Sequence, residues 1–451
     1  MGLRPLERDL TTGSVFRNIV FFSLPYLLSY FLQVLYGVAD LFIIGQFEGV
    51  ESTTAVSIGS QIMHMLTVMI VGLAMGTTVC IGQAVGAKNP KETALNLGNS
   101  ATLFMTLSIL LAGVLLILAK PIVSAMSTPA EAVSGTVAYL TICFIGVPFI
   151  TAYNIISSIF RGMGDSKSPM YFVAVACVGN ILLDYLFIGF FRLGPAGAAL
   201  GTTLSQTISV IVSLAYIGKR KMGLSVSKRD FKPQKAIMGK ILKIGFPICL
   251  QDGLIQIAFL IITIIANMRG LTDAAAVGIV EKIICFLFLT PSAMLSTVSA
   301  LGAQNIGAGK LRRAEETLRY SIMIAAGYGV AVSGVILCIA EPVVGWFTPD
   351  ASVIVAGGQY LRGYVWDCIF AGIHFCFSGY FCALGKSGLS FLHNIVAISL
   401  VRVPGVYLTS QLFPDTLLPM GIATALGSLV SVIVCVVAYL VISRPRQVTR
   451  A

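Results

Sequence analysis

Charged residues are scarce in this chain of 451 residues. They make up 11% of it, whereas a soluble domain usually carries about 25%. Hydrophobic residues make up 57%, and the mean hydropathy is +0.91. This composition excludes an ordinary soluble globular protein and predicts an all-α polytopic membrane protein.

Residues that bind metals or drive catalysis are also few. The chain has three histidines without metal-ligand spacing, and its ten cysteines lie in apolar runs without a CxxC pair, which favours packing roles. It contains no GxxxxGK[ST] phosphate loop, no HExxH motif and no Ser/His/Asp set. We therefore expect neither an enzyme nor a resident metal or cofactor.

The chain is instead rich in long apolar runs, and residues 15–47 are the most informative of them. The run is long enough to cross a bilayer, since about 20 helical residues span the hydrocarbon. Pro25 favours a kink within it, and Asp40 costs roughly 2.5–3.5 kcal/mol near a membrane helix centre. Polar residues at steps of four, three and four share one helix face: Ser29, Gln33, Tyr36 and Asp40. We interpret this stripe as the wall of an aqueous cavity.

Twelve apolar segments follow one another along the chain. They lie near 15–46, 53–83, 93–119, 133–160, 169–191, 195–218, 237–268, 273–303, 315–340, 353–381, 389–413 and 419–443. The longest polar linker, 218–240, separates two halves of six segments each. We therefore predict an N-lobe at 1–217, a basic cytoplasmic linker at 218–240 and a C-lobe at 241–451.

The two halves are related in sequence. An offset of 221 residues aligns the segment beginning at Tyr139 with the one beginning at Tyr360, and GQAVGAK with AQNIGAGK, whereas Pro25 meets Pro247 at 222. A parallel repeat of this kind places the substrate path near the interface between the halves.

The positive charges indicate the orientation. With a cytoplasmic N-terminus, the outer loops hold only Lys120, Arg192 and Arg269 of the 30 Lys and Arg residues, and most of the others fall on the inner side. The net charge of +11 then reflects topology and the anionic inner leaflet, and not nucleic-acid binding. We expect a multi-pass protein of the cell inner membrane with both termini in the cytoplasm.

The chain resembles the multidrug and toxic compound extrusion (MATE) family over nearly its whole length. The resemblance rests on VLYGVADLFIIGQF, GLAMGTTVCIGQAVGAKN, IFRGMGDSKSP and VGNILLDYLF, in this order, and on their echoes in the second half. It implies twelve transmembrane helices in two pseudo-symmetric six-helix lobes around a central cleft. It also implies export of organic cations against a proton or sodium gradient.

Within that family the chain looks most like the DinF-like branch, and this likeness implies a protonation or cation site in the first lobe. The corresponding residues are Asp40, Tyr36, Tyr139, Asn154, Asn180 and Asp184, with the first-helix bend at Pro25. The NorM-like branch has a Glu about eight residues after the proline of helix 7. Ile255 stands there in this chain, which argues against the NorM-like second-lobe sodium site.

The residues themselves support this site. Asn180 and Asp184 are four apart and share a helix face, and helix direction places Asp184 at about the level of Asp40. Two adjacent buried carboxylates cannot both ionise cheaply, so one is expected to hold a proton. The 221 offset carries neither carboxylate into the second half, as duplicated packing residues would be. The alternative is that both acids only hold helices together.

The second half has its own polar residues within apolar segments. They are Asp252, Glu281, Lys282, Asp367 and Arg402. Charges of both signs at similar depth can pair, so a structural network, substrate contacts and a second ion site all stay open.

We predict a secondary-active multidrug exporter that exchanges cationic or amphipathic small molecules for H⁺ and works as a monomer in the lipid bilayer. Sodium is the alternative coupling ion, since carboxylate and Asn oxygens also suit Na⁺. A lipid-linked oligosaccharide flippase is the rival transporter, although it would want a basic outer cleft. A receptor or scaffold that transports nothing is the rival from another class.

Overall fold

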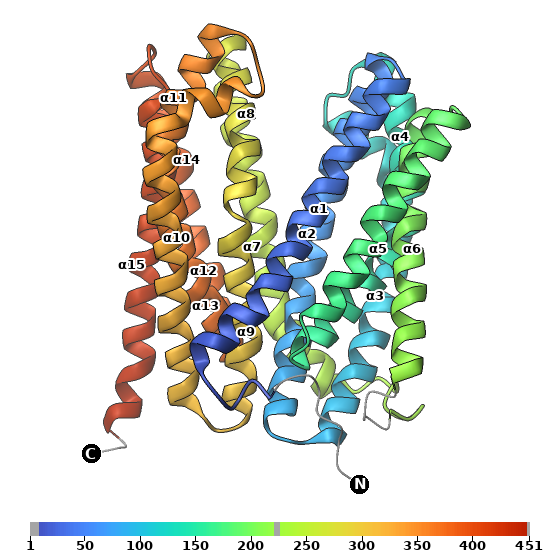
Figure 1. The fold of residues 1–451 in the computed structure, drawn as a ribbon, viewed down its shortest axis with the longest axis vertical. Helices are drawn as coiled ribbons and strands as arrows, with labels where there is room; N and C mark the ends of the chain where they lie inside the picture. Colours follow the sequence, from blue (N-terminus) through green and yellow to red (C-terminus); the bar gives the residue numbers. More distant parts are fainter. Residues whose placement is uncertain (1–8, 221–225, 449–451) are drawn as a thin grey trace. The chain divides into compact units, whose positions relative to one another are not determined.

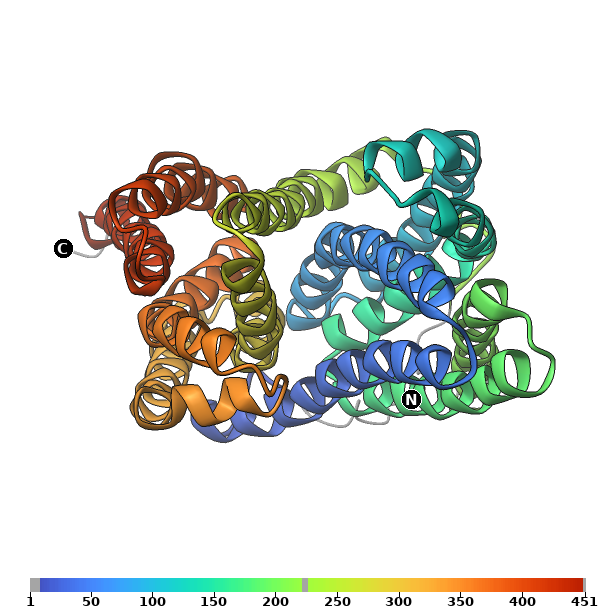
Figure 2. The ribbon, with the colours of Figure 1, turned by 90° about the horizontal axis from the view of Figure 1, so that it is seen from above.

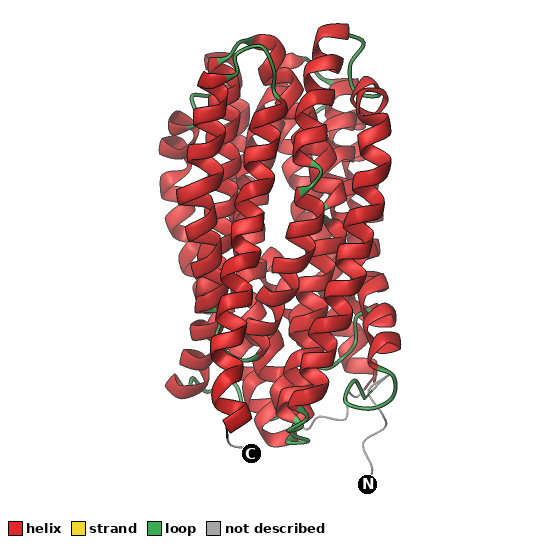
Figure 3. Ribbon diagram, turned by 90° about the vertical axis from the view of Figure 1, so that its left-hand side faces the viewer, coloured by secondary structure: helices red, strands yellow, loops and turns green. Residues whose placement is uncertain are grey.

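The computed structural model describes residues 9–220 and 226–448. Some basic residues counted above, among them Arg4, Arg8, Lys221 and Arg450, lie outside the described residues. Helices make up nearly all of the described chain, and this part contains no β-strand (Figure 3). The predicted all-α class is confirmed.

Six spans form the first half (Figure 1). They are α1 (Val15–Phe47), α2 (Val50–Gly86), α3 (Pro90–Ala125), α4 (Ala130–Gly162), α5 (Lys167–Asp184) with the π-helix η1 (Tyr185–Phe190), and α6 (Gly194–Arg220). The fifth span therefore changes from α-helical to π-helical geometry directly after Asp184.

The second half also has six spans, of which three are interrupted. They are α7 (Lys235–Met268), α8 (Leu271–Leu287) with α9 (Leu289–Gly307), α10 (Leu311–Gly345), α11 (Ala351–Tyr364) with α12 (Asp367–Ala383), α13 (Gly388–Ala397) with η2 (Ile398–Arg402) and α14 (Val403–Leu412), and α15 (Leu418–Val448). The α11–α12 pair bends by 41°, and eleven other described helices are long and apolar enough to cross a membrane. The twelve predicted spans are confirmed.

The chain divides into two compact units, and we call them the first and second lobes. The first comprises residues 20–245 with 307–309 and the described residues before 13, and the second comprises 13–19, 246–306 and the residues from 310 onward. Figure 2 shows the helices of each lobe nearly end-on. The division falls inside α7, close to the predicted lobe boundary.

The predicted linker 218–240 is partly helical, because α6 continues to Arg220 and α7 begins at Lys235. Long basic side chains allow a helix to extend past its apolar run, since the charged ends reach water while the stems stay on apolar surface. Between the two helices, Asn99 of α3 donates to the Asp230 carbonyl (3.1 Å) and accepts from the Gln234 amide (2.7 Å). The described part of the linker is thus fastened to α3.

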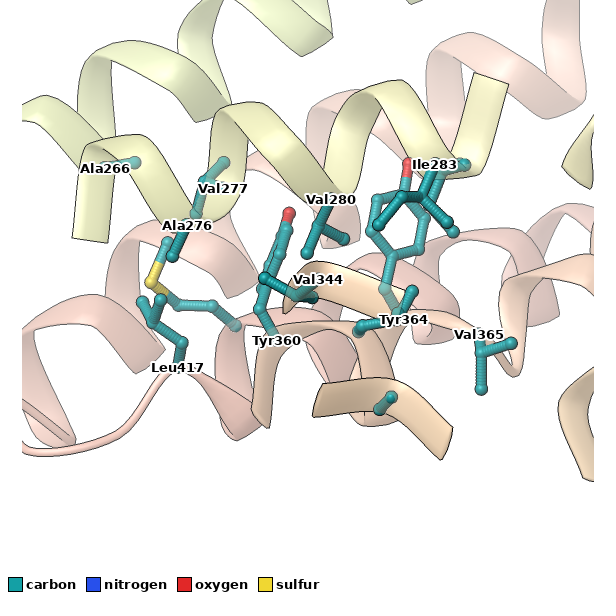
Figure 4. Close-up of a cluster of buried hydrophobic side chains, with 14 of the residues drawn as sticks. Ala266, Ala276, Val277, Val280, Ile283, Val344, Tyr360, Tyr364, Val365 and Leu417 are labelled. Carbon is teal, nitrogen blue, oxygen red and sulfur yellow. The ribbon is translucent and has the colours of Figure 1, made fainter. Parts of the chain in front are cut away.

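Each lobe has an apolar core. In the second lobe, Val277 and Val280 of α8 pack with Tyr360 and Tyr364 of α11 (Figure 4). Helices α11 and α15 approach closely here, and a Cβ on Gly363 would lie 2.4 Å from the Leu418 carbonyl oxygen. Close contact at small residues is the usual way in which membrane helices pack.

Candidate functional site

The lower part of α1 is anchored to α4. Helix α1 passes through Pro25 as one continuous helix, and the Ser29 hydroxyl donates to the Pro25 carbonyl at 2.8 Å. One residue after the proline, the Tyr26 hydroxyl accepts a hydrogen bond from Arg161, whose guanidinium lies 4.9 Å from the centre of the Tyr26 ring. Polar and cation–π contacts therefore tie the helix to α4 at its proline.

The polar stripe on α1 faces the interior of the first lobe. Gln33 interacts with the buried Tyr153 of α4, and Tyr36 interacts with Gln206 of α6. Side chains from three helices thus form one polar layer. The predicted face of α1 is accordingly the face that meets polar partners.

The two first-lobe carboxylates lie together at the end of this stripe. Asp40 is 3% exposed and Asp184 is 0% exposed, and each carboxyl interacts with the other. Thr202 of α6 donates to Asp40 at 3.2 Å. The Asn180 amide also interacts with Asp40, but its polar atoms make no well-formed hydrogen bond within the described residues. Asp40, Asp184, Asn180 and Thr202 are hereafter the acid-pair site.

The packing of Asp184 is tight. A Cβ built on Gly201 of α6 would lie 2.0 Å from Asp184 Oδ1, so only a glycine leaves room for the carboxyl in this position. Asp184 is also the last residue of α5 before η1, and π-helical segments are frequent at functional sites. The backbone and the neighbouring helix together fix the direction of this side chain.

The electrostatics of the acid-pair site are unusual for buried carboxylates. Among the described residues, neither Asp40 nor Asp184 forms an ion pair. Asp40 Oδ1 and both carboxyl oxygens of Asp184 are buried without a hydrogen-bond partner. Two adjacent charges without a cation are costly in a low-dielectric interior. The arrangement suits the sharing of one proton, and its oxygens also suit a monovalent cation.

The two remaining first-lobe candidates differ from each other. Tyr139 of α4 is buried with its ring against Gly59, and it interacts electrostatically with both carboxylates. Asn154 instead donates to the Ile150 carbonyl of its own helix at 2.8 Å. The structure therefore brings Tyr139 to the acid-pair site, and Asn154 makes a local bond on α4.

Sequence reasoning missed Thr202. It lies in α6, where the stretch Gly-Thr-Thr at 201–203 stands in an apolar helix. A membrane threonine commonly bonds its own helix, as Thr207 does to the Thr203 carbonyl at 2.8 Å. Only the fold distinguishes the two cases, because it places Thr202 opposite α1.

The second lobe holds an ion pair. Arg402, at the end of η2, lies 3.4 Å from Asp367 of α12 and donates to the Tyr364 hydroxyl. Its guanidinium also lies 5.4 Å from the centre of the Phe259 ring. Opposite charges thus meet here, as one of the three interpretations left open requires.

The other second-lobe candidates lie around or apart from this pair. The Thr263 hydroxyl donates to Glu281 at 3.3 Å, and the charges of Glu281 and Arg402 interact. Lys282, the next residue, is exposed at the protein surface. Asp252 interacts with Gln251 and with Cys382 of α12.

Comparison with known proteins matches the MatE family model to residues 25–186 and 247–408. The two matches are offset by 222 residues, in agreement with the predicted repeat. The chain is 29% identical to "Probable multidrug resistance protein YpnP" of Bacillus subtilis, covering 93% of each chain. It is 25% identical to "Multidrug export protein MepA" of Staphylococcus aureus, covering 88% of each.

Solved structures share the fold. A MATE in the bent conformation superposes with a TM-score of 0.91 at 23% identity, covering 98% of each chain. A MATE in the straight conformation superposes with a TM-score of 0.89 at 23% identity, covering 97% of this chain and 98% of the other. The two-lobe, twelve-helix architecture is therefore common to them and to this chain.

Proposed function

Because the chain belongs to the MatE family, we propose that it is a multidrug exporter that exchanges organic cations for protons at the acid-pair site. It is a membrane transporter and not an enzyme. Two of its relatives are named for multidrug resistance and multidrug export, which supports drugs as the substrates. The observation that carries the coupling proposal is the pair of buried carboxylates with three unpartnered oxygens and no cation beside them.

A proton at the acid-pair site changes the balance of forces on α1. While both carboxylates are ionised, repulsion and lost hydration oppose their burial, and a cationic substrate would relieve both. Uptake of a proton from the acidic outside removes one charge and allows a hydrogen bond between the carboxyls. The attraction for the cation is then lost, and α1 rearranges at Pro25, where the helix lacks one backbone hydrogen bond.

The surroundings of the protein belong to the same proposal. We infer that it lies in the cell inner membrane with both termini in the cytoplasm and acts as a monomer on cationic or amphipathic small molecules. The excess of Lys and Arg in the inner loops supports this orientation. No cofactor is required, since the ion gradient supplies the driving force.

Efflux of ethidium from everted vesicles tests the proposal. A pH gradient and a sodium gradient are imposed separately, on the parent protein and on Asp40→Asn and Asp184→Asn. Each variant keeps the side-chain shape and removes one titratable group. Asp350→Asn is the matched control, because Asp350 is an acid that caps α11 outside the spans and Asn is an equally good cap.

We expect efflux driven by pH that is lost in Asp40→Asn and Asp184→Asn and kept in the control. Transport by the two variants at the parent rate would overturn the acid-pair site. Efflux driven by sodium alone would keep the family and replace the coupling ion. If neither gradient drives efflux of ethidium or other organic cations, the flippase alternative replaces drug export.

A further inference from the structure

A second polar cavity lies wholly within the second lobe, away from the acid-pair site. Aromatic rings of Phe259, Phe288 and Phe375 form much of its wall, and Arg402, His374 and Asn394 supply polar groups. The space open to water centres is about 40 Å³, and one water needs roughly 10–15 Å³. The cavity therefore holds a group of a few heavy atoms and not a whole drug.

The polar wall of this cavity is cationic. Its lining includes Arg402 and no Asp or Glu. Ile255, at the position where an acid was considered in the sequence, is one of its apolar residues. Asp367, the partner of Arg402, is 0% exposed and lies behind the wall, and its contact with the guanidinium is a long one at 3.4 Å.

Two polar atoms on buried wall residues lack a partner. Arg402 is 8% exposed and His374 is 4% exposed, and neither Arg402 Nε nor His374 Nδ1 has a hydrogen-bond partner within the described residues. Arg402 Nε carries a hydrogen in every state, and a His ring nitrogen carries one in the appropriate tautomer. A buried donor without an acceptor costs free energy, so the wall is arranged for an acceptor that enters the cavity.

We propose that the second-lobe cavity binds a carboxylate, with Arg402 and His374 as donors and the three phenylalanines around the adjoining aromatic group. A carboxylate has the right size, carries the charge that the wall lacks, and accepts from a guanidinium in a short charge-assisted bond. The planar faces of the rings suit an aromatic acid. The inference goes beyond the proposed function, and only its transport readout rests on that function.

A pair of fluorescent dyes separates the carboxylate from the rest of the ligand. Rhodamine 110 has a free carboxylate, and rhodamine 123 is its methyl ester. Binding of each to the purified full-length protein is measured by fluorescence anisotropy for the parent and for His374→Phe, which keeps an aromatic ring and removes both ring nitrogens. We expect the Kd of rhodamine 110 to rise about tenfold, and that of rhodamine 123 to change less than twofold.

The double variant Arg402→Met with Asp367→Leu provides a second test. It removes the ion pair as a unit, so no uncompensated charge stays buried and the protein is expected to fold. The preference for rhodamine 110 should disappear in it. Phe375→Leu is the control for the apolar wall and should alter the binding of both dyes equally. Equal losses for both dyes in His374→Phe and in the double variant would overturn the proposal.

Benzoate distinguishes a free carboxylate from one carried by the substrate. If benzoate displaces rhodamine 110 from the parent but not from the double variant, the cavity takes small free carboxylates. If benzoate has no effect while the dye preference persists, the carboxylate must arrive as part of a larger substrate. Failure of vesicle efflux for both dyes, with the binding preference intact, would count against the proposed function and not against this site.

Discussion

Gly201→Ala is a sharp test of the acid-pair geometry, because it adds one methyl group and changes no charge. The new Cβ would lie 2.0 Å from Asp184 Oδ1, whereas ordinary contacts begin at 3.4 Å. The carboxyl oxygen must therefore retreat by about 1.4 Å. Asp184 can turn at its side chain, but it then moves relative to Asp40, which Thr202 holds from the other side.

A displacement of this size is large for proton transfer between fixed groups. A misplacement of about 1 Å can cost roughly a hundredfold in rate, and overpacking costs about 1–3 kcal/mol in stability. We therefore expect efflux driven by pH to fall by between ten- and a hundredfold. Gly179→Ala in α5 is the matched control, because its Cβ would meet nothing closer than Ser205 Cβ at 3.7 Å.

The assay pairs vesicle efflux over a range of imposed pH gradients with thermal unfolding of the purified variants. Gly179→Ala should match the parent in transport and should not be less stable, since alanine favours helix over glycine. Parent-like efflux by Gly201→Ala across the pH range would refute the argument that Asp184 must occupy its observed position. Loss of efflux together with loss of folded protein would call for Gly201→Ser at reduced temperature, with the same expected defect.

Three further predictions follow from individual contacts. Thr202→Val removes the hydrogen bond to Asp40 and should shift the pH dependence of efflux, whereas Thr207→Val, which loses only a bond within α6, should leave it unchanged. Asn99→Leu removes two hydrogen bonds to the segment before α7 and should cost about 1–3 kcal/mol, seen as faster proteolysis there. Hydrogen bonds from the Ser352 side chain and two backbone amides lower the pKa of Asp350, so Asp350→Ala should reduce the melting temperature at neutral pH. That difference should vanish as the pH falls through the lowered pKa, because the protonated cap loses its advantage.

The twelve spans could be predicted from sequence because each is a long apolar run, and such runs have few alternatives to a membrane helix. The interruptions could be predicted only in part. The break after Leu287 and the change after Arg402 precede Pro291 and Pro404, which are visible signals. The bend at 365–366 and the π-helix after Asp184 contain no proline, so only tertiary packing specifies them.

The acid-pair site shows a similar limit. Spacing predicts that Asn180 and Asp184 share a face and that Asp40 ends a polar stripe, since these are properties of single helices. Thr202 and Gly201 depend on which neighbour α6 faces, and a single sequence carries no such information. Asn154 shows the converse, because a resemblance placed it in the site while the structure shows it bonded to its own helix.

The two lobes share a helix order and differ in how they treat buried acids. In the first, Asp40 and Asp184 face each other without a cation, so their charge can be removed only by a proton or a bound ion. In the second, Asp367 has the permanent charge of Arg402 beside it, so ionisation leaves that lobe nearly neutral. A neutral pair has little free energy to exchange with a pH gradient, whereas two uncompensated carboxylates have a great deal. This difference assigns ion coupling to the first lobe and leaves the second free to recognise an anionic group on the substrate.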